Sequence, residues 1–327
     1  MFRSLLRATG ALACTTVLIS PFLLSTGAFA HGVAGKRVFP TTLTIDDPAV
    51  ADEVSLPTVQ YQRRGASDDD SALHRTDIST EFSKRITENF GFSVNSSYTI
   101  LNRIGQNNSY GFGNIETTLK YQFLQNAPHE LLMSVGVSRE WGGTGAQGIG
   151  AESLGSTTPR LYFGKGFGDL PDALNWVKPF AITGILGYQF ADVPTQTSTV
   201  VDDDGNVSLR SSHSPDLFVY GASLQYSIPY LQANVKDLGL PDFLGRLTPL
   251  VEFSYTSPAT TSNGVRTTGT IAPGFVYSGE SFQLAAEALI PATKGSNVST
   301  GFIFQVHFFL DDIFPKTLGA PIVDWFK

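Results

Sequence analysis

Residues 301–310 read GFIFQVHFFL, and the order of residue types in this stretch decides the fold. Every second residue is aromatic or aliphatic, whereas Gln305 and His307 lie between them. A period of two is the pattern of a β-strand whose two faces meet different surroundings. We therefore predict a strand here with Gln305 and His307 on one face. Its other face is apolar and carries Phe302, Phe304, Val306, Phe308 and Leu310.

The same alternation recurs in residues 90–100, 114–123, 131–138, 217–228 and 282–290. The second face of these segments is mostly Ser, Thr, Gly, Asn and Gln, whereas a sheet exposed to water usually carries Lys, Glu and Arg there. Aromatic residues gather near the segment ends, which is typical of outer-membrane barrels with lipid on one side. A soluble β-sandwich or jelly roll is the alternative. The aromatic residues are Phe90, Tyr98, Tyr121, Phe123, Phe218, Tyr226 and Phe253.

The connections between these segments alternate between long and short. Long ones fall near residues 65–73, 102–111, 142–158, 191–215, 257–266 and 292–298, and a short helix is expected near residues 231–236. Long outer loops and short periplasmic turns characterise transmembrane barrels. We therefore predict an all-β protein, a transmembrane antiparallel up-and-down β-barrel of about 12 strands.

Residues 1–30 have the composition of a secretory signal peptide. Arg3 and Arg7 precede an apolar run, and Ala28 and Ala30 are the small residues at a cleavage site. A membrane anchor, or a lipoprotein modified at Cys14, is the alternative. No later stretch has the roughly 18 apolar residues of a spanning helix. We predict cleavage near Ala30 and localisation in the cell outer membrane of a Gram-negative bacterium.

The chain then divides into three parts. Residues 31–56 lack periodicity and form a periplasmic leader, long enough to enter the lumen as a plug. Residues 57–310 form the barrel, and residues 311–327 form a C-terminal periplasmic tail that tucks into the lumen or lies on the rim. A closing strand ending in aromatic residues resembles the signal read by the barrel-assembly machinery, although that strand usually ends the chain. The expected partners are the lipid bilayer, this machinery and a small-molecule solute.

The charge and the scattered histidines exclude several other functions. Removing residues 1–30 takes away Arg3 and Arg7 and no acidic residue, so the net charge falls from −7 to −9, which disfavours nucleic acid. No Ser partner for His307 is evident, so we predict no catalytic site, no enzyme activity and no cofactor. A copper site from His31 and His129, and a calcium site in the sequence DDDGN at 202–206, both lack needed ligands. We predict no metal site.

The segment GFGNIETTLKY, residues 111–121, resembles a strand signature of the MetA-pathway-of-phenol-degradation family of outer-membrane transporter and channel proteins. The resemblance extends from about Arg75 to Leu310, and the family usually has Asp in place of Asn114. It implies a barrel that passes small molecules, aromatic ones among them, and supplies no catalytic residues.

The strand alternation places a mixed set of polar and charged residues in the lumen. Apolar residues such as Leu132 and Ile303 share this face, and a barrel of about 12 strands is narrow, which disfavours a general pore for sugars or ions. The function predicted from the sequence is passive passage of small, apolar or aromatic molecules. A closed structural barrel and a barrel enzyme acting on lipid are the alternatives. The predicted lumen residues are Glu81, Arg85, Asn95, Glu116, Lys120, Arg160, Glu252, Glu287, Gln305 and His307.

Overall fold

A computed structural model describes residues 32–66, 72–201, 207–260, 265–293 and 298–326. The predicted signal peptide, His31 and the acidic runs at 68–70 and 202–206 lie outside the described residues. Within those ranges, none of the helices has the length and apolar character needed to cross a membrane.

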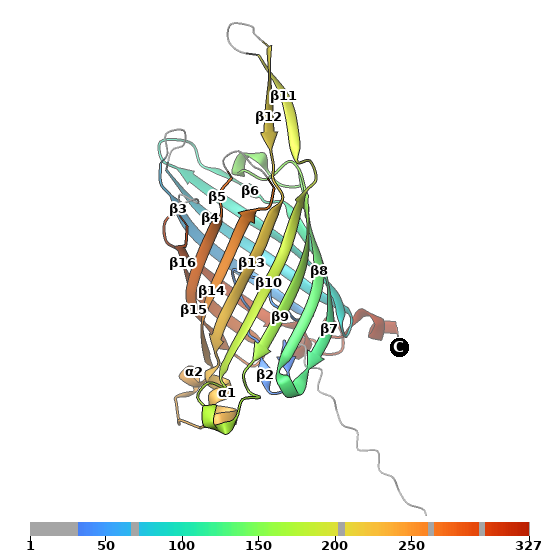
Figure 1. Ribbon diagram of the computed structural model, residues 1–327, viewed down its shortest axis with the longest axis vertical. Coiled ribbons are helices and arrows are strands. Elements are labelled where there is room, and N and C mark those ends of the chain that lie inside the picture. The colour runs from blue at the N-terminus through green and yellow to red at the C-terminus, as the bar shows by residue number, and fades with distance from the viewer. Residues whose placement is uncertain (1–31, 67–71, 202–206, 261–264, 294–297, 327) are drawn as a thin grey trace, which may run out of the picture.

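Twelve antiparallel strands close into a barrel, which confirms the predicted fold class (Figure 1). Each strand pairs with its neighbour along the barrel, and the last pairs with the first. The short strand β6 (Ser109–Phe112) pairs with the same strand, β5, as its successor β7 and continues β7 toward the long-loop end. The strands are β3 (Glu53–Arg64), β4 (Leu73–Thr87), β5 (Phe90–Arg103), β7 (Ile115–Asn126), β8 (Leu131–Trp141), β9 (Ser156–Gly166), β10 (Phe180–Ala191), β13 (Leu217–Tyr226), β14 (Leu247–Pro258), β15 (Thr268–Ser278), β16 (Phe282–Pro291) and β17 (Gly301–Phe309).

The closing strand β17 has the two faces that its sequence predicts. Phe302 is 52% exposed on the outer face, whereas Gln305 and His307 are 8% and 2% exposed on the inner face. The prediction for Leu310 is wrong, because β17 ends at Phe309 and Leu310 is the buried first residue of helix α3 (Leu310–Ile313). Its backbone N–H donates to the carbonyl of Asp52 at 2.9 Å.

Aromatic pairs between neighbouring strands stabilise the outer face. Tyr61 of β3 stacks on Phe302 of β17 with ring centroids 5.4 Å apart, and Tyr188 of β10 meets Phe218 of β13 edge to face at 5.1 Å. Such cross-strand pairs each contribute roughly 0.2–1 kcal/mol relative to alanine pairs. The residue types that mark the strand ends in the sequence therefore form the lipid-facing surface.

The two ends of the barrel differ, as the loop lengths predict (Figure 1). One end carries the long hairpin of β11 (Thr195–Val201) and β12 (Val207–His213). The other has short turns and helices, and the described parts of both termini lie there. By the loop rule for such barrels we call this the periplasmic end. Besides α3, its helices include η1 (Ala127–His129), η3 (Asp172–Leu174), α1 (Ile228–Tyr230), η4 (Leu231–Val235) and α2 (Asp242–Gly245), of which η4 confirms the helix expected near residues 231–236.

A charged substitution on the outward face should destabilise the barrel more near the middle of the membrane than near its surface. Leu119 of β7 is 52% exposed and pairs with Phe92 and Val137, so we expect Leu119→Arg to lower the unfolding free energy by about 2–4 kcal/mol. Urea titration in lipid vesicles measures this change. The control is Ile104→Arg at an exposed turn beyond β5, where we expect about 0–1 kcal/mol. Equal costs at the two positions would contradict the outward orientation of Leu119.

Candidate functional site: the barrel lumen

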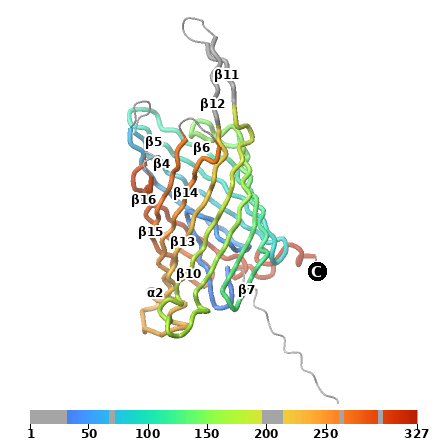
Figure 2. Tube along the Cα trace, in the orientation of Figure 1, coloured from blue at the N-terminus to red at the C-terminus, as the bar shows by residue number. Residues whose placement is uncertain are grey.

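Residues 32–52, which we call the lumen segment, run inside the barrel, where their contacts reach strands on several sides. Thr41 bonds to β16, Leu43 and Thr44 bond to β14, and Asp46 bonds to β7. Ile45 packs against Tyr162 of β9 and Ile185 of β10. In the tube view the blue start of the described chain lies behind the barrel wall (Figure 2).

The lumen segment begins as a small hairpin of β1 (Val33–Ala34) and β2 (Arg37–Val38), whose turn needs Gly35 at φ +64°. Arg37 is 1% exposed and donates to Glu130 Oε2 at 3.1 Å and to the carbonyl of Pro179 at 2.9 Å. Its guanidinium also lies 3.8 Å from the ring centre of Tyr230. Burial and a hydrogen bond to Glu130 raise the pKa of Tyr230 to about 12, so this ring is neutral. Arg37 thus fixes the hairpin to the periplasmic rim.

Side chains of the barrel wall accept hydrogen bonds from backbone N–H groups of the lumen segment where the segment has no regular secondary structure. Glu252 is 0% exposed and accepts hydrogen bonds from the N–H of Leu43 at 3.0 Å and of Thr44 at 2.6 Å. Gln283 accepts from the N–H of Thr41 at 3.0 Å. A buried backbone N–H without a partner is costly, so these inward side chains hold the segment in one path.

Glu287 lies on the inner face of β16 beside the carboxyl group of Glu252. Glu287 is 4% exposed and Glu252 is 0% exposed. Both glutamates therefore occupy the part of the lumen that is shielded from water.

On the opposite wall, Lys120 of β7 anchors the middle of the lumen segment. Its ammonium lies 2.9 Å from Asp46 Oδ1 and 2.9 Å from the carbonyl of Asp47, over the ring of Tyr162. Arg160 of β9 lies 3.8 Å from Glu116 of the same wall. The positive charges of this wall thus face carboxylates from both the wall and the segment.

The imidazole of His307 joins Ser55 and Glu53 of β3 in a hydrogen-bonded chain. Ser55 Oγ lies 2.9 Å from Nδ1, and Glu53 Oε2 lies 3.1 Å from Nε2. The residue types are those of a hydrolase triad, but the ring is reversed, since the nucleophile of a triad bonds to Nε2 and the carboxylate to Nδ1. All three groups lie on paired strands near the β3 bulge. We interpret the chain of bonds as a brace between β17 and β3.

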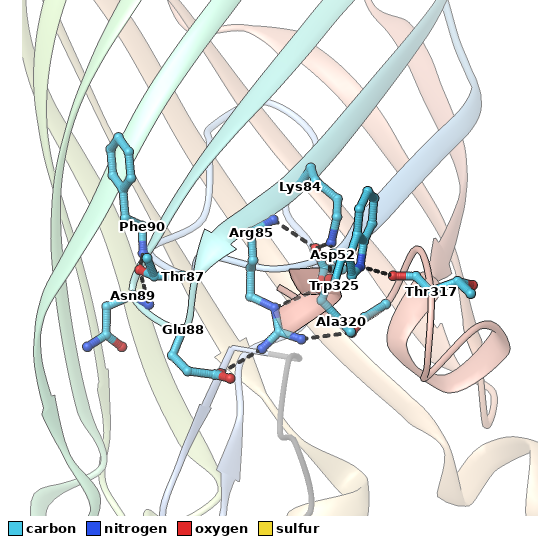
Figure 3. Close-up of polar contacts among 11 residues, drawn as sticks. Asp52, Lys84, Arg85, Thr87, Glu88, Asn89, Phe90, Thr317, Ala320 and Trp325 are labelled. Carbon is cyan, nitrogen blue, oxygen red and sulfur yellow. Dashed lines mark hydrogen bonds and ion pairs between the residues drawn. The ribbon is translucent and has the colours of Figure 1, made fainter. Parts of the chain in front are cut away.

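A cluster of polar residues at the periplasmic rim holds the C-terminal end of the lumen segment (Figure 3). Asp52, fully buried, accepts from Lys84 Nζ at 2.6 Å and from Arg85 Nε at 2.8 Å. Lys84 also donates to the carbonyl of Ala320 at 2.6 Å, and Arg85 donates to that of Gly319 at 3.0 Å. The cluster therefore joins the segment, β4 and the C-terminal tail.

A polar cavity of about 220 Å³ remains between the lumen segment and the wall formed by β17, β3, β4, β5 and β7, with Arg160 of β9 at its side. Six of the ten residues predicted from the sequence line it: Glu81, Asn95, Glu116, Arg160, Gln305 and His307. Of the other four, Lys120 and Glu252 bind the lumen segment directly, and Glu287 lies next to Glu252. Arg85 binds Asp52 at the rim. The predicted set is thus split by the lumen segment into a part that faces the cavity and a part that binds the segment.

Sequence reasoning missed the acidic and polar residues near the start of the chain that share this cavity, namely Asp46, Asp47, Glu53 and Ser55. They lie in or beside a stretch without periodicity. Strand β3 begins at Glu53, before the expected start at Pro57. Pro57 lies in a bulge, where the strand pairing does not require a backbone N–H, so the proline does not end the strand. Alternation extended back across Pro57 would have revealed Glu53 and Ser55 as inward residues.

Comparisons with known proteins identify the fold. No family model matches the chain, and no curated protein matches it. Among solved structures, the COG4313 outer membrane channel from Pseudomonas putida F1 is 11% identical with a TM-score of 0.52, covering 83% of this chain and 98% of that one. The KdgM porin is 13% identical with a TM-score of 0.41, covering 77% of this chain and 98% of the porin.

Proposed function

The chain has the fold of outer-membrane channels, and we propose that it is a channel for small solutes whose lumen is closed by residues 32–52. The polar cavity beside the lumen segment is the observation that carries the proposal, because charged and polar side chains of the wall surround space inside the bore that the segment partly fills. We also propose an outer-membrane location after cleavage near Ala30 and insertion by the barrel-assembly machinery. N-terminal sequencing of protein recovered from outer membranes tests the cleavage site.

The middle of the lumen segment is held mainly by a few polar contacts. Its bonds to Glu252 and Lys120 involve charged groups and contribute a net of about 1.5–3 kcal/mol each, and its bond to Gln283 contributes about 0.5–1.5 kcal/mol. Ile45 adds an apolar contact with Tyr162 and Ile185. We infer that the segment moves aside without unfolding the barrel.

The cavity lining favours polar solutes over the apolar or aromatic ones predicted from the sequence and implied by the family resemblance. Carboxylates outnumber cationic side chains there, and charges lining a narrow bore set its selectivity. We therefore propose that small neutral or positively charged solutes pass more readily than anions. The lining carboxylates are Asp46, Asp47, Glu53, Glu81 and Glu116, against Arg160 and His307.

A closed structural barrel is the second candidate, because the lumen segment fills much of the bore. A disulfide between the segment and the wall separates the two functions. A Cβ built on Gly221 of β13 lies 2.5 Å from Ile45 Cγ2 and 2.6 Å from the carbonyl oxygen of Phe253, so Ile45→Cys with Gly221→Cys places two thiols side by side once β13 shifts slightly from β14. The mature chain has no cysteine that would interfere, since the only one is Cys14.

We expect oxidation of this double variant to lower uptake of a small neutral solute by liposomes to the rate of protein-free vesicles, and dithiothreitol to restore it. The physical reason is that a tethered lumen segment cannot leave the bore. Each single-cysteine variant is a control and should not respond to oxidant. Uptake that is the same with and without a disulfide verified by mass would contradict gating by the segment. Absence of uptake in every variant would favour the closed barrel.

A further inference from the structure

The C-terminal tail, residues 310–326, leaves the lumen side and packs against the outer side of the barrel rim. Its last turn η6 (Ile322–Phe326) contacts β4, and the tail projects beside the barrel at its periplasmic end (Figure 1). The sequence predicted a tail tucked into the lumen or lying on the rim, whereas it lies on the outer side of the rim.

The orientation of Lys84 shows that this contact is on the lipid-facing side. Arg85 pairs with Gly91, and a Cβ built on Gly91 would meet Val50 of the lumen segment, so these two positions point inward and the next position on each strand points outward. Lys84 pairs there with Phe92. Lys84 is nevertheless only 2% exposed, because the tail covers it. The ring centre of Trp325 lies 5.3 Å from its ammonium, and Figure 3 shows the two side chains side by side.

The tail exposes an unusual amount of apolar surface for its length. Six large apolar side chains between residues 313 and 326 are each at least 39% exposed, and Phe326 is 85% exposed. Such a concentration of exposed apolar side chains in a short segment marks contact with a membrane or with another protein. The six residues are Ile313, Phe314, Leu318, Val323, Trp325 and Phe326.

We propose that the tail is an interfacial anchor embedded in the periplasmic leaflet of the membrane that the barrel spans. Continuity favours lipid as its partner, because the tail extends the lipid-facing surface at Phe92 past the end of β4. Trp and Phe side chains concentrate at membrane–water interfaces. The charge of Lys84 beneath the tail is compensated by Asp52 at 2.6 Å, so the contact brings no unpaired cation to lipid.

The anchor predicts that the apolar tail side chains lie at the depth of the lipid headgroups and the first acyl carbons. The chain has three tryptophans, so Trp141→Phe with Trp176→Phe leaves Trp325 as the sole reporter. In phosphatidylcholine vesicles, we expect bromine atoms near the headgroup end of the acyl chains to quench its emission more than bromine atoms near the chain ends. This test concerns the tail alone and is independent of the channel function.

A matched control carries its only tryptophan at Gln106, an exposed turn at the opposite end, in a chain that also has Trp325→Phe. We expect that neither the lipid brominated near the headgroup end nor the lipid brominated near the chain ends quenches this tryptophan. Phe326→Cys with a polarity-sensitive dye is a second reporter at a side chain whose exposure makes misfolding improbable, and it should report the same shallow depth. Failure of both lipids to quench Trp325 would overturn the proposal. So would a disulfide between two copies at position 326, which would assign the surface to self-association.

Discussion

We expect removal of residues 32–51 to raise the single-channel conductance of the protein from a small, intermittent value to a large and continuous one. The deletion takes away the partners of Glu252, Gln283 and Lys120, whose freed groups then face water instead of the segment. It retains Asp52, because that carboxylate balances Lys84 and Arg85 at the rim. Recordings in planar bilayers at fixed voltage measure the change.

The same recordings test the proposed selectivity. The deletion removes Asp46 and Asp47 with the segment, but Glu53, Glu81 and Glu116 stay on the wall. Under a KCl gradient we therefore expect a reversal potential that favours K⁺, and a smaller value for the Glu81→Gln and Glu116→Gln variants. Heat-modifiable migration on gels controls for folding. A folded deletion variant that conducts no more than the full chain would disprove closure by the segment.

The barrel could be predicted because its cause is local. Each strand meets lipid on one face and the lumen on the other, so the choice between Leu119 and Thr118 as the outward residue depends on parity alone. The path of the lumen segment has no such local signature. It is set by contacts such as that of Thr41 with Gln283, which are 242 residues apart in the chain.

Parity also identified inward residues without showing what they contact. Glu252 and Lys120 face the lumen as predicted from alternation, but the sequence does not indicate that both hold the segment and not a solute. Lys84 illustrates the opposite case, since a lysine among outward residues contradicts the pattern until the tail and Asp52 are seen to cover it. The sequence therefore predicts which way a side chain points, but not its role where that role depends on contact with a distant segment.

The second large effect is a loss of stability, which we expect from Asp52→Ala in the polar cluster at the periplasmic rim. Asp52 is fully buried and accepts from Lys84 at 2.6 Å and from Arg85 at 2.8 Å, so its removal takes from Lys84 the carboxylate that it binds and leaves Arg85 with the exposed carboxylate of Glu88. Loss of one partner from a buried ion pair costs about 3–5 kcal/mol. We expect a fall of that size in the unfolding free energy, measured by urea titration in lipid vesicles.

The partners of Asp52 supply the controls that separate this charge effect from simple loss of packing. Glu88 also pairs with Arg85, but its side chain is 66% exposed, so Glu88→Ala should cost only about 0–1 kcal/mol. Adding Lys84→Met to Asp52→Ala removes one stranded cation and should recover part of the loss, because the two effects are coupled through a direct contact. If the losses from Asp52→Ala and Lys84→Met simply add in the double variant, the ion pair does not stabilise the rim, and the lumen segment and tail are held there by their backbone contacts alone.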